Sequence, residues 1–112
     1  MVGRMRQMHA LIAWTTAQSD TPEAMRAQLL ACIGKLDNIE VVPDVYVVKF
    51  NTFARYERLV DKLQDVARQN PGAVRLILTP PIMGGSYRGW LPTSRWATIR
   101  TLTGRKPKDS PE

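Results

Sequence analysis

Residue types that carry several common chemistries are scarce in this chain of 112 residues. Cys32 is the one cysteine and His9 the one histidine, so a single chain can form neither a disulfide nor a zinc site of the usual ligand spacing. No apolar run approaches the roughly 18 residues of a membrane-spanning helix, so we expect no membrane association. A lone, unbridged cysteine fits a reducing compartment, and the sequence therefore predicts a cytoplasmic protein.

Acidic residues are missing from most of the two ends of the chain. Between residues 20 and 65, eight acids stand against six basic residues, whereas the flanks hold ten basic residues and only the two acids Asp109 and Glu112. The net charge of +6 therefore resides in the flanks. Basic flanks attract polyanions and speed their encounter, which favours an anionic partner.

The apolar pattern predicts one α+β domain. Its length and its apolar content of 44% are those of a single globular unit. We expect strands at 8–16, within 39–50 and at 73–80, and helices that begin near 22 and span 51–70. Two strands joined by a tight turn, or one strand bent at an edge, are both open at 39–50. We prefer the hairpin because Pro43 has no amide donor for a central ladder.

The resulting order, βαββαβ, is that of a ferredoxin-like sandwich. Both helices then cover one face of an antiparallel sheet, and the other face is left for water, a ligand or another subunit. We expect the ferredoxin-like domain at 1–91 and a basic C-terminal extension at 92–112. Expected helix caps are Thr21 for the first helix and Asn51 or Thr52 for the second. The expected apolar stripes are Met25, Leu29, Cys32/Ile33 and Leu36, then Tyr56, Leu59/Val60, Leu63 and Val66/Ala67.

Residues 8–91 resemble the ferredoxin-like superfamily of CRISPR-associated protein two, which includes the VapD-type toxins and the SinR-like proteins. The stretches that carry the resemblance are "MHALIAWTT", "VYVVKFNTFARYERLVDKL" and "VRLILTPPIMGGSYRGWLP". The resemblance implies a dimer that pairs sheets, with a C-terminal segment that crosses to the partner, and some members bind or cut nucleic acid. Metal-dependent members have an Asp at the end of the first strand. This chain has "AWTTAQ" there, and its first acid is Asp20, which speaks against cleavage because a carboxylate is what holds Mg²⁺ beside a phosphate.

Residues 82–108 hold six basic side chains, two Trp, one Tyr and no acid. Flat rings stack on unpaired bases and guanidinium groups pair with phosphates, so their alternation is typical of single-strand binding. Two roles stay open for the tryptophans, which stack on bases or anchor this segment to the sheet or to a partner. The candidate nucleic-acid-binding residues are Tyr87, Arg88, Trp90, Arg95, Trp96, Arg100, Arg105, Lys106 and Lys108, with Arg4 and Arg6.

These patterns predict a small, dimeric nucleic-acid-binding protein with no cofactor, no metal and no catalytic residue. His9 is expected to be a strand residue, and Cys32 a buried thiol on a helix stripe. The first alternative is a protein-interaction or assembly module that docks through its C-terminal segment. The second is a metal-dependent nuclease of the resembled superfamily that uses Asp20 or a distant acid.

Overall fold

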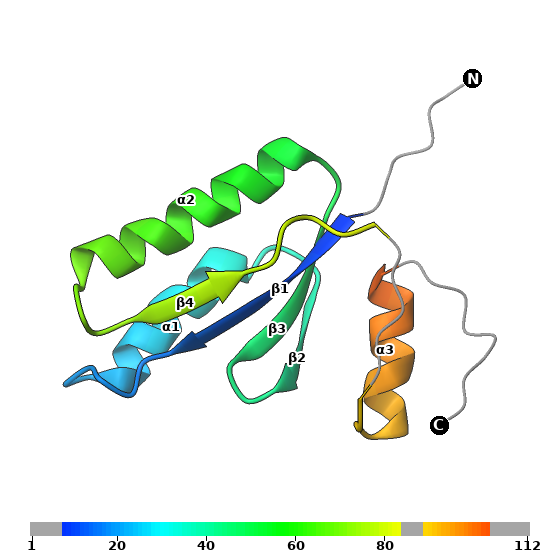
Figure 1. Ribbon diagram of the computed structural model, residues 1–112, viewed down its shortest axis with the longest axis horizontal. Coiled ribbons are helices and arrows are strands. Elements are labelled where there is room, and N and C mark those ends of the chain that lie inside the picture. Colours follow the sequence, from blue (N-terminus) through cyan, green and yellow to red (C-terminus); the bar gives the residue numbers. More distant parts are fainter. Residues whose placement is uncertain (1–7, 84–88, 104–112) are drawn as a thin grey trace.

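The computed structural model describes residues 8–83 and 89–103, which form four strands and three helices (Figure 1). One antiparallel sheet has the strand order β2-β3-β1-β4. This order and the succession of elements confirm the predicted ferredoxin-like α+β fold. The elements are β1 (Met8–Thr15), α1 (Pro22–Ile33), β2 (Asn38–Val42), β3 (Val45–Phe50), α2 (Phe53–Gln69), β4 (Arg75–Leu78) and α3 (Thr93–Thr103).

The main core lies between the sheet and the helices α1 and α2. In β1, Ala10, Ile12 and Trp14 point into it, because alternate side chains of a strand share one face. The register places Ile12 opposite Tyr46 of β3, and the Trp14 and Tyr46 rings have centroids 4.9 Å apart. The two central strands thus provide the apolar surface on which α1 and α2 pack.

Both predicted helices are present, with the predicted stripes inward. Met25, Leu29 and Ile33 of α1 are buried, as are Leu59 and Leu63 of α2. Cys32 is half-buried at the margin of this core, where burial raises the pKa of its thiol.

The helix starts differ in how they are capped. The Thr52 hydroxyl accepts a 3.2 Å hydrogen bond from the Arg55 amide, as expected for the cap of α2. Thr21 is the N-cap residue of α1, as predicted, but its side chain makes no capping hydrogen bond. The first helical residue is Pro22, whose ring has no amide hydrogen to leave unbonded.

The preference for a hairpin at residues 39–50 is confirmed. β2 and β3 pair antiparallel across a turn at Pro43 and Asp44. Asp44 adopts the left-handed region with φ of 64°, which Asp tolerates better than most residues. Its carbonyl accepts a 3.1 Å hydrogen bond from the Trp14 amide of β1, so the turn is tied to the centre of the sheet.

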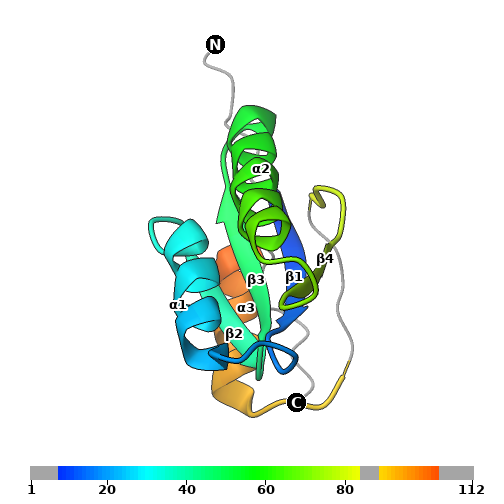
Figure 2. The same cartoon turned by 90° about the vertical axis from the view of Figure 1, so that its left-hand side faces the viewer.

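The helix α3 lies on the opposite side of the sheet from α1 and α2 (Figure 2). It contacts β2 and β3, and it buries Ile99 and Thr103. The expectation of an uncovered second face is therefore wrong for its β2–β3 half. On the β1–β4 half of this face an apolar side chain remains open to solvent, since Ile77 of β4 is 70% exposed. Among the described residues, no helix is both long and apolar enough to cross a membrane.

Candidate anion-binding site

The structure places four of the predicted binding residues. Arg95, Trp96 and Arg100 lie on α3, and Trp90 lies just before it. The remaining predicted residues, Arg4, Arg6, Tyr87, Arg88, Arg105, Lys106 and Lys108, lie outside the described residues. Asp20, the acid of the nuclease alternative, is exposed between β1 and α1.

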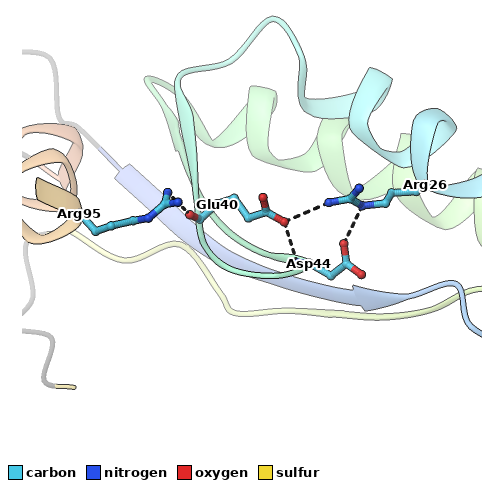
Figure 3. A network of polar contacts seen from close by, with 4 residues as sticks. All are labelled: Arg26, Glu40, Asp44 and Arg95. Atoms are coloured by element: carbon cyan, nitrogen blue, oxygen red, sulfur yellow. Dashed lines mark hydrogen bonds and ion pairs between the residues drawn. The ribbon is translucent and has the colours of Figure 1, made fainter. Parts of the chain in front are cut away.

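The Arg95 side chain is hydrogen-bonded to the edge strand of the sheet (Figure 3). Its Nη1 donates a 2.6 Å hydrogen bond to the main-chain carbonyl of Glu40 on β2. A guanidinium on a main-chain carbonyl ties the first turn of α3 to the edge strand. This contact gives Arg95 a structural role beside the phosphate contact that the sequence suggests.

The Glu40 side chain continues this network away from α3 (Figure 3). Its Oε2 accepts a 2.9 Å hydrogen bond from the Asp44 amide and a 3.2 Å hydrogen bond from Nη2 of Arg26. Nε of Arg26 donates to Asp44 Oδ1 at 2.8 Å. The network joins α1, the β2–β3 turn and, through the backbone of β2, the helix α3.

These contacts account for three shifted pKa values. The Asp44 amide, and then the Arg26 charge, hold the pKa of the Glu40 carboxyl below its ordinary value. Asp44 raises the pKa of Arg26, by its hydrogen bond and its charge. Burial, and then the neighbouring Glu40 charge, raise the pKa of Tyr46. At neutral pH these shifts favour a charged Glu40, a charged Arg26 and a neutral Tyr46. The network therefore has a structural role, since it holds α1 to the β2–β3 turn.

The two tryptophans near α3 have different surroundings. Trp96 is half-buried, and a Cβ placed on Gly89 would lie 3.8 Å from its Cζ2 atom. The Trp96 ring therefore packs beside the chain that leads into α3. Trp90 is 98% exposed, so its ring faces are open to a ligand.

Arg100 is the other described basic residue of α3 among the predicted candidates. Its Nε atom is shielded from solvent and has no hydrogen-bond partner within residues 8–83 and 89–103. A shielded cationic donor without a partner is unfavourable, and an anion beside it would relieve that cost.

A pocket of about 260 Å³ lies at one end of the sheet, where the segment after α1 meets the end of β3 and the start of α2. The Lys49 amide donates a 2.8 Å hydrogen bond to the Asp37 carbonyl, which holds two of these walls together. The pocket is lined by Lys35, Leu36, Asp37, Lys49, Phe50, Asn51 and Arg55.

Three of the lining side chains are cationic, namely Lys35, Lys49 and Arg55, and one, Asp37, is acidic. The lining therefore carries two net positive charges. In the part of the chain that the structure describes, the ion pairs join Arg26 to Glu40 and Asp44, and Arg68 to Asp65. None of these pairs involves a cation of the pocket, so their charge is available to an anion.

Sequence reasoning missed this pocket because its residues come from the charge-balanced middle of the chain. A signal was nevertheless present. In a β-hairpin, the residues before the first strand lie beside the last residues of the second strand. The predicted hairpin at 39–50 therefore already implied that residues 35–37 and 49–51 share one end of the sheet.

His9 and Cys32 offer no exposed catalytic group. His9 is fully buried in β1, where burial lowers the pKa of its imidazole, and its backbone pairs with Ile82. This placement agrees with the expected strand position. Within the described ranges, no cluster of three His, Cys, Asp or Glu residues is arranged to hold a metal ion.

Neither a known protein-family model nor a curated protein matches this sequence. Among solved structures, the chain is similar to the hypothetical protein MJ1052 from Methanocaldococcus jannascii, with a TM-score of 0.52 and 11% sequence identity. The similarity covers 88% of this chain and 99% of that one. At this identity the likeness supports the fold alone, and the resemblance to CRISPR-associated protein two stays a prediction.

Proposed function

We propose that this protein binds nucleic acid, and that it does so as a cytoplasmic homodimer. The observation that carries the proposal is the pocket at the end of the sheet. Lys35, Lys49 and Arg55 come from three separate segments and converge there, free of ion pairs within the described residues. With Asp37 in the same lining, two net positive charges remain, and this excess favours an anionic ligand.

The position of the pocket also supports the proposal. Met8, the first described residue of β1, pairs with Phe50 of the pocket, and α3 ends toward the same end of the sheet (Figure 1). Arg100 lies in the last turn of α3 and so belongs to this end of the sheet. Basic groups gathered at one end would form a single electrostatic surface for a phosphate backbone.

Trp90 supports a contact with unpaired bases. Its side chain is 98% exposed. Stacking of a base on an open aromatic ring is favourable for any base. Trp96 acts as a brace for α3, since its ring already packs beside Gly89. The proposed contacts are thus the cations of the pocket and the open Trp90 ring, which precedes the start of α3, the end of that helix that points away from the pocket (Figure 1).

The homodimer rests on the half of the second sheet face that α3 does not cover. Ile77 of β4 pairs with Ala13 of β1, and its side chain is 70% exposed. An apolar sheet face is stable in water when a second layer covers it. A second copy of the chain would supply that layer.

The exposed side chains of Trp90 and Ile77 also favour a second candidate function, a protein-interaction module. Its partner would be a different chain seated on the same half-face or on the Trp90 ring. The two candidates differ in their need for the basic pocket, which only nucleic-acid binding uses.

The test compares two double variants of equal charge change. Lys49→Gln with Arg55→Gln removes two pocket cations, and Arg58→Gln with Lys62→Gln removes two cations from the exposed surface of α2. We expect the pocket variant to weaken binding of a labelled single strand at least tenfold, because charge-assisted hydrogen bonds are lost along with charge. The control should weaken it by much less. Equal effects of the two variants would mean that the pocket is not the binding surface.

A further inference from the structure

We propose that the basic pocket recognises a phosphate monoester, the group found at the phosphorylated end of a strand and in a mononucleotide. This inference rests on the proposed function, and it names the chemical group that the pocket takes. The remaining length of a bound strand would lie outside the pocket, toward the other basic residues of the protein.

The charge of the pocket matches a monoester better than a backbone phosphate. Lys35, Lys49 and Arg55 against Asp37 leave two positive charges. A phosphate monoester carries about −1.5 to −2 charges at neutral pH, whereas each internal phosphodiester carries one. The monoester therefore neutralises the pocket, and a diester leaves one cation in excess.

The size of the pocket points the same way. Its volume of about 260 Å³ is far more than the roughly 10–15 Å³ that one water needs. It lies just below the roughly 300–1,000 Å³ of pockets that enclose a whole drug-sized ligand. The space suits a phosphate with part of its sugar.

The donors and acceptors that line the pocket fit the same ligand. Lys35 and Lys49 each offer three rotating donors, Arg55 offers a planar fork, and Asn51 offers an amide. A monoester has three terminal oxygens to receive them. The Asp37 carboxylate accepts hydrogen bonds, and the neighbouring group of a nucleotide that donates them is a sugar hydroxyl. A purely basic surface would lack such an acceptor.

The experiment titrates the full-length protein with labelled single strands of one sequence that carry a 5′-phosphate, a 3′-phosphate or hydroxyl groups at both ends. Adenosine monophosphate, titrated separately and as a competitor, distinguishes a free mononucleotide from a strand end. The variants are Lys49→Gln and, independently, Arg55→Gln, each with its circular dichroism checked, and the matched control is Arg58→Gln.

We expect at least one phosphorylated strand to bind the wild type roughly tenfold more tightly than the hydroxyl-ended strand. Each pocket variant should bring this ratio close to one, and Arg58→Gln should leave it unchanged. Equal binding of all three strands by the wild type would overturn the inference while nucleic-acid binding stands. If no strand binds, the proposed function fails. In that case, binding of adenosine monophosphate that Lys49→Gln abolishes would still support the pocket as a monoester site. If adenosine monophosphate does not bind either, the pocket assignment is overturned as well.

Discussion

Arg95 of α3 donates a 2.6 Å hydrogen bond to the main-chain carbonyl of Glu40, which lies 55 residues earlier in the chain. The same Glu40 binds Arg26 and the Asp44 amide through its side chain. One edge-strand residue thus links the helix layer on one face of the sheet to α3 on the other. α3, which lies in the segment predicted to be a C-terminal extension, is in this way bound to the sheet.

The Arg95 contact predicts a loss of stability on truncation. Arg95→Ala should lower the free energy of unfolding by about 1 kcal/mol, since a charged donor is lost from a bond that is partly open to water. Urea denaturation of this variant beside Arg58→Ala, an exposed arginine of α2, is the measurement. The Arg58 change should have almost no effect. Equal stability of the two variants would contradict the structural role of Arg95.

The tryptophans predict opposite outcomes for one kind of substitution. Trp90→Ala should leave the free energy of unfolding unchanged, because the ring is 98% exposed, and should weaken single-strand binding by about 1–3 kcal/mol. Trp96→Ala should lower stability by about 1–2 kcal/mol, less than the roughly 3–5 kcal/mol of a fully buried Trp. Thermal melts and a binding titration of both variants test this pair. A destabilised Trp90→Ala protein would show that this ring braces the fold.

The parts of the fold that sequence reasoning predicted correctly are those with strong local signals. The β-branched run at 45–50 gave a strand, and Pro43 gave the turn. Spacings such as Leu59 to Leu63 gave the inward face of α2. In each case the local preference and the final packing agree, so a short window of sequence was enough.

The parts that were missed depend on contacts between distant segments. α3 holds Thr at 93, 98, 101 and 103, and β-branched residues are weak helix formers. Its stability comes from docking Ile99 and Thr103 on the sheet, which no local window reveals. The pocket was missed for the same reason, since Lys35, Lys49 and Arg55 become neighbours only when the hairpin and α2 have folded.

The exposed half of the second sheet face predicts a dimer. Light scattering at micromolar concentration should give twice the 12.7 kDa mass of the chain, with an interface of at least about 1,000 Å² in total. Ile77→Lys should shift the protein to the monomer, because it places a charge in that interface. Val42→Lys, at an exposed apolar residue of β2, should leave the dimer intact. A monomeric wild-type protein would contradict the proposed assembly.

The burial of His9 predicts a dependence of stability on pH. Since burial lowers the imidazole pKa in the folded protein, the unfolded chain takes up the proton first as the pH falls. Stability should therefore be full above the ordinary pKa of about 6.5 and should decline below it. The lowered pKa of Glu40 has its effect only further into the acid range, below its ordinary value of 4.5.

Urea denaturation at pH 7.5 and pH 5.5 measures this dependence. The wild type should be less stable at the lower pH, and the difference should shrink in His9→Gln, which cannot be protonated. If the two proteins show the same difference between the two pH values, His9 does not cause it.

The dependence of nucleic-acid affinity on salt tests the central claim most directly. The wild-type protein should be titrated against single- and double-stranded DNA and RNA at several salt concentrations. If the pocket cations and the basic flanks contact phosphates, the logarithm of the binding constant should fall linearly with that of the salt concentration. Each neutralised phosphate contributes a slope of about −0.7 to −0.9, so contact with even one phosphate predicts a slope of about −0.7 or steeper. Absence of measurable binding to all four nucleic acids, even at low salt, would contradict the claim.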